Sequence, residues 1–443
     1  MKIALCHFRV GETDGVSLEM DKWKKALEQL GHEVIFIAGS DKRGEAEIIP
    51  ELHYQYAINN KIVQQAYGQT EYPWSEEKLR GRILMVAELI EQALLEIIRC
   101  RAIDVLIPNN ILSLGWGLPA GIGFVNAIKK SKVKAICHHH DFYWERDLYA
   151  HPNHKMIEDM LKDYFPPVHP RIEHVCINSI AQGELKSRHG VEADVVPNVF
   201  DFDHDLMKVD DYNREMRREF GIQNSDIVLL QATRVVERKA IEIAIDYAAA
   251  LEKKRDLLVN QKGYNGESFT EKSHIYLVLA GQSESPEYLK KLKLYALEKG
   301  VKIKDISSNV EPERSENTEE KKFSLWDVYT MADLVTYPSI LEGWGNQFLE
   351  ALVAKLPVAV YKYPVYQSDI EKYQFNVLSF GHQHQSDNNW VRVDEEKIEK
   401  AADESIKYLL DADYRTKQVE ENYNTAKREL SIDGLQKMLA KIF

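Results

Sequence analysis

Short apolar runs alternate with amphipathic, helix-length segments along most of this chain. Apolar runs bounded by polar or turn residues predict buried strands, and segments with a 3.6-residue apolar period predict helices. The predicted strands cover residues 2–6, 34–38, 105–108, 133–137, 174–178, 226–231, 275–280, 334–337 and 357–361. The predicted helices cover residues 18–30, 82–100, 240–251, 326–331, 395–410 and 414–440. This alternation predicts an α/β fold built from βαβ units with parallel sheets.

The length of the chain predicts more than one domain. At 443 residues it exceeds what one hydrophobic core usually serves, and two domains of about 200 residues each are the natural division. Residues 252–273 lack periodicity and predict a long exposed loop. Residues 41–80 are mixed and rich in tyrosine, and their pattern assigns no element.

Charge and composition narrow the class of partner. The formal net charge of −13 argues against a nucleic-acid partner and weakly against docking on anionic lipid, although a local basic patch can hide within that total. Four cysteines lie in the first half without a Cys-x-x-Cys pair. The N-terminal apolar run is too short for a signal peptide, and no segment has the roughly 18 apolar residues of a membrane span. These features predict a cytoplasmic protein.

Residues 335–363 place two carboxylates where a βαβ unit binds ligands. The stretch reads as a strand, a glycine-containing turn, a helix and a second strand. Ligands of such units lie outside the carboxyl ends of the strands, near the helix N-terminus. Glu342 lies in the turn and Glu350 in the helix, with seven residues between them. Two glutamates on a solvated helix are the alternative interpretation.

The motif PSILEGWGNQFLEA at residues 338–351 resembles the Glu-x7-Glu signature of retaining glycosyltransferases of family 4, which have the GT-B fold. The resemblance implies that Glu350 accepts hydrogen bonds from the ribose of a nucleotide sugar and that Glu342 contacts the transferred sugar. It also implies that the backbone between them faces the diphosphate. The implied donor-binding residues of this backbone are Gly343, Trp344, Gly345 and Asn346.

A second motif follows the strand at 226–231. Arg234 and Lys239 match the Arg-x4-Lys element of that family, whose two cations hold the donor diphosphate. A leaving nucleoside diphosphate gains negative charge as the glycosidic bond breaks, and fixed cations stabilise it. The glycine usual after this lysine is Ala240 here, and a surface basic cluster is the alternative. Gly281, in the turn after the strand at 275–280, lies near where the family's nucleotide sits.

The strand at 133–137 runs into the sequence His138-His139-His140-Asp141. Consecutive side chains on an extended chain point in alternate directions, so the three histidines do not converge on one metal ion. The family keeps a histidine, often followed by aspartate, that reaches the transferred sugar. His140 with Asp141 fits this pattern best, and His139 is the rival. Asn109 and Asn110, after another strand, either bind sugar hydroxyls or form an Asx turn.

The first loop carries one further candidate. The family usually has two glycines before its first helix, and here Gly15 keeps one of them while Asp14 replaces the other. The amides at this helix start either approach the donor phosphate or belong to a plain turn with an N-cap at Ser17.

Taken together, the resemblance implies a GT-B fold of two Rossmann-like domains facing each other across a cleft. Residues 1–199 form the acceptor domain and residues 200–420 the donor domain, with the final helix at 421–443 packing back on the first domain. The implied function is retaining transfer of a hexose from UDP-glucose or GDP-mannose to an acceptor hydroxyl, without a metal or other cofactor. Catalytic roles fall to His140, Asp141, Arg234, Lys239 and Glu342.

The acidic balance favours a small soluble acceptor over a lipid-linked one. Three alternatives stay open at this point. Two are enzymes on the same fold, a sugar phosphorylase and a nucleotide-sugar epimerase. The third is a regulator that binds a nucleotide sugar without turnover.

Overall fold

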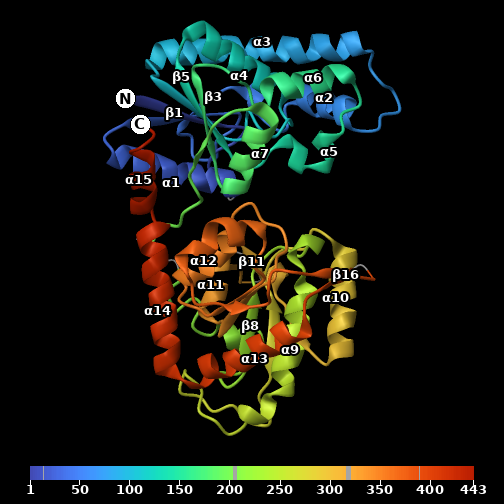
Figure 1. Cartoon of the computed structure of the whole chain (residues 1–443), viewed down its shortest axis with the longest axis vertical. Coiled ribbons are helices and arrows are strands. Elements are labelled where there is room, and N and C mark those ends of the chain that lie inside the picture. The colour runs from blue at the N-terminus through green and yellow to red at the C-terminus, as the bar shows by residue number, and fades with distance from the viewer. Residues whose placement is uncertain (13, 203–206, 316–320, 389) are drawn as a thin grey trace. The chain divides into compact units, whose positions relative to one another are not determined.

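The computed structural model describes residues 1–12, 14–202, 207–315, 321–388 and 390–443 (Figure 1). This part of the chain forms two compact units. Unit 1 consists of Met1–Val199 together with Ile432–Phe443, and unit 2 consists of Phe200–Ser431. The segment at the end of the chain that joins unit 1 therefore begins at Ile432, later than the predicted start at residue 421.

Unit 1 contains a parallel sheet with the order β3-β2-β1-β4-β5-β6-β7 in its described residues. The order reverses between β1 and β4, as in doubly wound α/β sheets. Its strands are β1 Lys2–His7, β2 Glu33–Ala38, β3 Ala46–Ile48, β4 Val105–Pro108, β5 Lys134–His139, β6 Ile172–Cys176 and β7 Asp194–Val195.

Helices cover both faces of this sheet, so apolar side chains are buried on each side (Figure 1). One core cluster holds Ile83 and Phe124 from the packed pair α3 and α4, and the other holds Trp23 and Leu435 from the packed pair α1 and α15. The helices are α1 Gly15–Gln29, α2 Ala57–Tyr67, α3 Glu76–Arg101, α4 Leu118–Ser131, α5 Asp147–Ala150, α6 Lys155–Tyr164, α7 Ser179–His189 and α15 Ile432–Leu439.

Unit 2 contains a second parallel sheet with the order β10-β9-β8-β13-β14-β15 in its described residues. Two small pairs, β11 with β12 and β16 with β17, lie outside it. The strands are β8 Ile227–Gln231, β9 Ile275–Leu279, β10 Lys302–Asp305, β11 Val310–Glu311, β12 Phe323–Ser324, β13 Leu334–Tyr337, β14 Val358–Val360, β15 Leu378–Ser379, β16 Gln385–Asp387 and β17 Trp390–Arg392.

The helices of unit 2 contact one another through α13. α9 contacts α10 and α13, while α14 contacts α12 and α13. The two parallel sheets confirm the predicted α/β class with Rossmann-like units. The helices are α8 Met216–Glu219, α9 Ile241–Lys253, α10 Pro286–Lys299, α11 Leu325–Thr330, α12 Asn346–Val353, α13 Glu395–Leu410 and α14 Ala412–Glu429.

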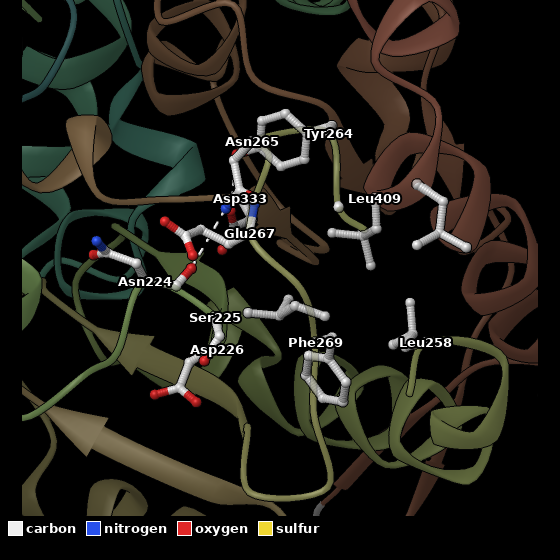
Figure 2. Close-up of a pocket in the computed structure, with 13 residues that line it drawn as sticks. Asn224, Ser225, Asp226, Leu258, Tyr264, Asn265, Glu267, Phe269, Asp333 and Leu409 are labelled. Atoms are coloured by element: carbon white, nitrogen blue, oxygen red, sulfur yellow. Dashed lines mark hydrogen bonds between the residues drawn. The ribbon is translucent and has the colours of Figure 1, made fainter. Parts of the chain in front are cut away.

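The structure differs from two predictions about elements of the second half. The single helix predicted at 414–440 is broken after Glu429, because Leu430 leaves helical geometry and α15 starts at Ile432. The loop predicted as exposed at 252–273 buries Leu258 and Phe269. Figure 2 shows these two side chains with Leu409 around a hollow.

That hollow is remote from the edge where parallel sheets bind ligands. It is lined by Ile227, the first residue of β8, and therefore lies at the amino end of the strand. Ligands of such sheets lie at the carboxyl ends. We therefore assign the hollow to the packing of the loop and not to a substrate.

Among the described helices, none combines the length and the apolar character needed to cross a membrane.

Candidate functional site

Two loops of unit 2 that carry predicted residues leave from neighbouring strand ends. β8 pairs in parallel with β13, with Leu230 opposite Val335, so the loops after both strands start at the same edge of the sheet. The loop after β8 carries Arg234 and ends in the short helix Glu237–Lys239. The loop after β13 carries Glu342. This edge is where α/β sheets place their ligands.

Glu342 meets one cation on each oxygen of its carboxylate. Nζ of Lys239 donates to Oε1, and Nη1 of Arg238 lies 3.1 Å from Oε2. Only 4% of the Lys239 side chain and 10% of the Glu342 side chain are exposed. Two positive charges against one negative charge leave a surplus of +1 in a largely buried group, which favours an anion as ligand.

Burial and the neighbouring charges shift the pKa values of both Glu342 and Lys239. Burial alone would raise the pKa of Glu342, but Lys239 and Arg238 outweigh it and hold the pKa below its ordinary value. Burial lowers the pKa of Lys239, and the charges of Arg238 and Arg234 add to this lowering while Glu342 opposes it. Glu342 is therefore an anion at neutral pH, and Arg234 acts electrostatically on the same small region as Lys239.

Arg234 lies at the surface, next to a close approach of two backbones. Its guanidinium pairs with Glu284, and about half of each side chain is exposed, so solvent keeps the pair weak and exchangeable. Gly281 sits beside it. A Cβ at Gly281 would lie 2.0 Å from the carbonyl oxygen of Thr233, which real side chains do not tolerate. Glycine at this position lets the loops after β8 and β9 touch.

Glu350 lies near the middle of α12, as the fifth of its eight residues, and is buried. Its Oε2 accepts a hydrogen bond of 2.6 Å from the hydroxyl of Tyr329, which is also buried. Tyr329 holds the carboxylate in place, and no sequence signal pointed to this residue. Glu342 and Glu350 therefore have different surroundings: one carries two cations, and the other accepts from a neutral hydroxyl.

The turn between the two glutamates is tightly fixed. Gly345 has φ of +114°, and a Cβ there would lie 2.1 Å from the hydroxyl oxygen of Tyr363. That hydroxyl donates to the carbonyl oxygen of Trp344 at 2.6 Å. Gly343 and Trp344 form the bend, and Asn346 is the first residue of α12. Nε1 of the buried Trp344 has no hydrogen-bond partner in the part of the chain that the structure describes.

In unit 1 the rings of His138 and His139 have different hydrogen-bond partners. Nδ1 of His138 lies 2.9 Å from Oδ1 of Asn109. The ring of His139 bridges two buried groups, with Nδ1 2.8 Å from Oγ of Ser113 and Nε2 2.9 Å from Nδ1 of His174. No group of three or more His, Cys, Asp or Glu side chains suited to a metal ion occurs among the described residues.

His140 differs from the other two. Its buried Nε2 has no hydrogen-bond partner among the described residues. The adjacent Asp141 accepts hydrogen bonds of 2.6 Å from Nδ2 of Asn110 and from Nε of Arg146. Both ring nitrogens of His139 have hydrogen-bond partners, whereas Nε2 of His140 has none among the described residues, and the assignment of His140 to the transferred sugar stays a prediction.

Asn110 supports this segment through its side chain, a role that differs from the two predicted for it. Its Oδ1 accepts from the backbone amide of His140 at 2.8 Å, and its own backbone is left-handed with φ of +56°. Its side chain also donates to Asp141. Asn110 therefore positions the two candidate residues.

The start of α1 differs from the prediction of a phosphate-facing turn. The N-cap is Asp14, not Ser17, and Oδ1 of Asp14 accepts from the amides of Val16 and Ser17 at 3.1 and 3.2 Å. Gly15 is the first helical residue. Because a carboxylate already occupies these amides, they are poorly placed to bind a second anion. The proposed role of Gly15 at the phosphate stays a prediction, and the geometry weakens it.

The lowered pKa values of the buried histidines predict how the stability of the protein depends on pH. Burial lowers the pKa of His138 and His139 well below the ordinary value, that of His174 to about 4 and that of His140 to about 3. In the unfolded chain a histidine takes up its proton near pH 6.5. Between about pH 6.5 and 4 the unfolded state thus binds more protons, and stability falls as the pH falls.

His174→Gln should weaken this pH dependence. It removes one group that is neutral when folded and charged when unfolded, so the slope of unfolding free energy against pH should drop by about 1.4 kcal/mol per pH unit. Glutamine still offers a hydrogen bond to His139. Urea unfolding at a series of pH values measures the slope, and His151→Gln, at an exposed position, is the control. An unchanged slope in His174→Gln would contradict the assignment.

Comparison with known proteins finds a family model and two sequence relatives that match this chain. A family model described as Glycosyl transferases group 1 matches residues 213–425. A mannosylglucosylglycerate synthase of Petrotoga mobilis is 42% identical over 411 residues, covering 93% of this chain and 94% of the relative. Another protein of the same name, from Thermotoga maritima, is 38% identical over 444 residues, covering 100% of this chain and 99% of the relative.

Solved structures of low sequence identity share the fold. A glycosyltransferase of Rickettsia africae aligns with a TM-score of 0.62 at 15% identity, covering 100% of this chain and 97% of that one. An Anabaena protein solved in complex with UDP aligns with a TM-score of 0.58 at 14% identity, covering 100% and 99%. These likenesses confirm the predicted GT-B fold class.

Proposed function

Since this chain belongs to the group 1 glycosyl transferases and is a glycosyltransferase, we propose that it transfers a mannosyl residue from a nucleotide diphosphate mannose to glucosylglycerate. The product is then the compound named in both relatives, mannosylglucosylglycerate. These relatives match nearly the whole chain. Family membership favours transfer over phosphorolysis, epimerisation or sensing without turnover. Of the donors predicted from the sequence, GDP-mannose supplies this sugar and UDP-glucose does not.

One structural observation carries the proposal for the donor. Lys239 and Arg238 outnumber the carboxylate of Glu342 at the carboxyl edge of the sheet, and Arg234 lies nearby. A diphosphate is the part of the donor that such a surplus of positive charge would stabilise. Charge on the diphosphate rises as the bond to the sugar breaks, so the cations favour the transition state over the bound donor.

The roles proposed for the other residues follow from the resemblance. Glu350, held by Tyr329, accepts from the ribose hydroxyls, and Glu342 accepts from hydroxyls of the transferred sugar. His140 and Asp141 are the proposed contributors from unit 1. In the reaction the bond from the anomeric carbon to the phosphate oxygen breaks, and a bond to the acceptor oxygen forms. The acceptor proton passes to a phosphate oxygen, so both glutamates stay ionised.

A panel assay tests the proposed function. The protein is incubated with GDP-mannose or UDP-glucose, each with and without glucosylglycerate, and nucleotide release and product mass are followed. We expect release of GDP only when both GDP-mannose and glucosylglycerate are present. Release from UDP-glucose instead would overturn the proposed donor. Turnover of GDP-mannose only with a different acceptor would overturn the proposed acceptor.

The role of Glu350 predicts a specific loss of nucleotide affinity. Charge-assisted hydrogen bonds contribute about 1.5–3 kcal/mol each, so Glu350→Gln should weaken binding of GDP about 10- to 100-fold. Tyr329→Phe keeps the charge and should have a smaller effect. Calorimetric titration measures both, with Glu298→Gln on the exposed face of α10 as control. Unchanged affinity in Glu350→Gln would remove this residue from the ribose site.

We also propose that the reaction needs no metal ion. Lys239 and Arg234 supply the positive charge that a divalent cation would otherwise bring to the leaving diphosphate. Turnover should therefore stay within about twofold when excess EDTA is added, and dialysis against EDTA should have no further effect. Loss of activity that magnesium or manganese restores would contradict this prediction.

A further inference from the structure

Arg238 was not among the residues predicted from the sequence, yet it is the best-anchored cation near Glu342. Its Nη1 donates to the carbonyl oxygen of Leu341 at 2.9 Å and lies 3.1 Å from Oε2 of Glu342. Its own carbonyl oxygen accepts from the amide of Ile340 at 3.0 Å. Backbone and side chain of Arg238 thus hold the loop at residues 340–342 at three points.

Lys239 is anchored differently. In the described part of the chain its ammonium forms an ion pair with Oε1 of Glu342. It also lies 5.9 Å from the ring centre of Tyr337, a weaker contact. A flexible lysine with one strong partner can turn to another anion, whereas Arg238 is fixed by the loop itself. Each oxygen of the Glu342 carboxylate has its own cation, Lys239 on Oε1 and Arg238 on Oε2. Lys239 can therefore leave while Arg238 stays.

Without Arg238, moving the ammonium of Lys239 away from Glu342 would be unfavourable. Glu342 is largely buried, and a buried carboxylate left without a partner is strongly destabilised. If Lys239 were its sole counter-ion, any ligand that drew the ammonium away would leave the buried carboxylate of Glu342 unpaired. Arg238 removes that penalty, because it remains on Oε2 throughout.

We propose that a nucleoside diphosphate draws the ammonium of Lys239 off Glu342, and that Arg238 is the positioning residue that keeps Glu342 paired and in place during this exchange. The inference rests on the proposed donor site at Lys239. It gives Arg238 a role that works through Glu342 and needs no contact with the phosphate. Arg234, by contrast, acts on the diphosphate directly.

A double-mutant cycle tests the exchange. The probe is GDP, with UDP in parallel, because a nucleoside diphosphate lacks the sugar that Glu342 is proposed to contact. Arg238→Gln should weaken GDP binding about 10- to 100-fold, since the exchange now strands Glu342. In the background of Glu342→Gln there is no carboxylate to strand, so adding Arg238→Gln should change the affinity less than about threefold. Arg234→Gln should weaken binding equally in both backgrounds.

Glu342→Gln alone gives a second readout that does not require Arg238→Gln to fold. Freeing Lys239 from its partner should leave GDP binding as tight as in the wild type or tighter. Weaker binding in Glu342→Gln would overturn the exchange, as would equal losses from Arg238→Gln in the two backgrounds. In both cases, normal GDP binding by the wild type would still support the proposed donor site. Failure of the wild type to bind GDP or UDP would instead overturn the donor site and the exchange with it.

Discussion

Lys239→Met should lower kcat about 100-fold or more while leaving unit 2 folded. Loss of one fixed group that stabilises developing negative charge typically costs on the order of 100-fold in rate, and Lys239 is the buried cation of the group. Methionine fills a similar volume, and Arg238 still neutralises Glu342. The buried carboxylate is therefore not stranded, so the loss of stability should be modest.

Steady-state kinetics with saturating donor and acceptor measures this effect, and circular dichroism and thermal unfolding report the fold. Lys253→Met is the control, because Lys253 lies at the far end of α9, the helix that follows Lys239, with 65% of its side chain exposed. It should keep wild-type turnover. A folded Lys239→Met with wild-type kcat would show that the assignment of Lys239 to the leaving group is wrong.

Gly281→Ala should abolish tight binding of the nucleotide and destabilise unit 2. The added Cβ would lie 2.0 Å from the carbonyl oxygen of Thr233, a backbone atom that cannot rotate away. The loops after β8 and β9 must then separate. This breaks the bonds between them, including that from the amide of Val235 to the carbonyl oxygen of Gln282 at 2.9 Å. Arg234 would be displaced with its loop.

Overpacking of this kind typically costs about 1–3 kcal/mol, and urea unfolding gives the value directly. Calorimetric titration with GDP gives the loss of affinity, which we expect to exceed 100-fold. Gly183→Ala in α7 is the control, since a Cβ there meets no atom within 4 Å. Near-normal GDP binding by Gly281→Ala would contradict the placement of the donor phosphates beside this turn.

The sequence predicted best those features that depend on neighbouring residues. The strand β13, the turn before α12 and the strand β14 follow from one continuous stretch whose apolar period changes from strand to helix to strand.

Features that depend on distant residues could not be predicted. The pairing of Lys239 with Glu342 joins residues 103 positions apart. The need for glycine at 281 arises from the backbone at Thr233 in another loop. The hydroxyl of Tyr329 reaches Glu350 from a separate helix. The break between α14 and α15 was missed because the apolar period continues across Leu430, while the end of the chain joins a different unit.

The measurement that tests the central claim most directly is proton NMR of the product made from GDP-mannose and glucosylglycerate. The account predicts GDP and one new mannosyl residue on the glucosyl group. In the roles proposed for them, neither glutamate is free to act as a base behind the anomeric carbon, so the new anomeric signal should keep the α configuration of the donor. A β-linked product would contradict the retaining mechanism, and no mannosyl transfer to glucosylglycerate would contradict the proposed function itself.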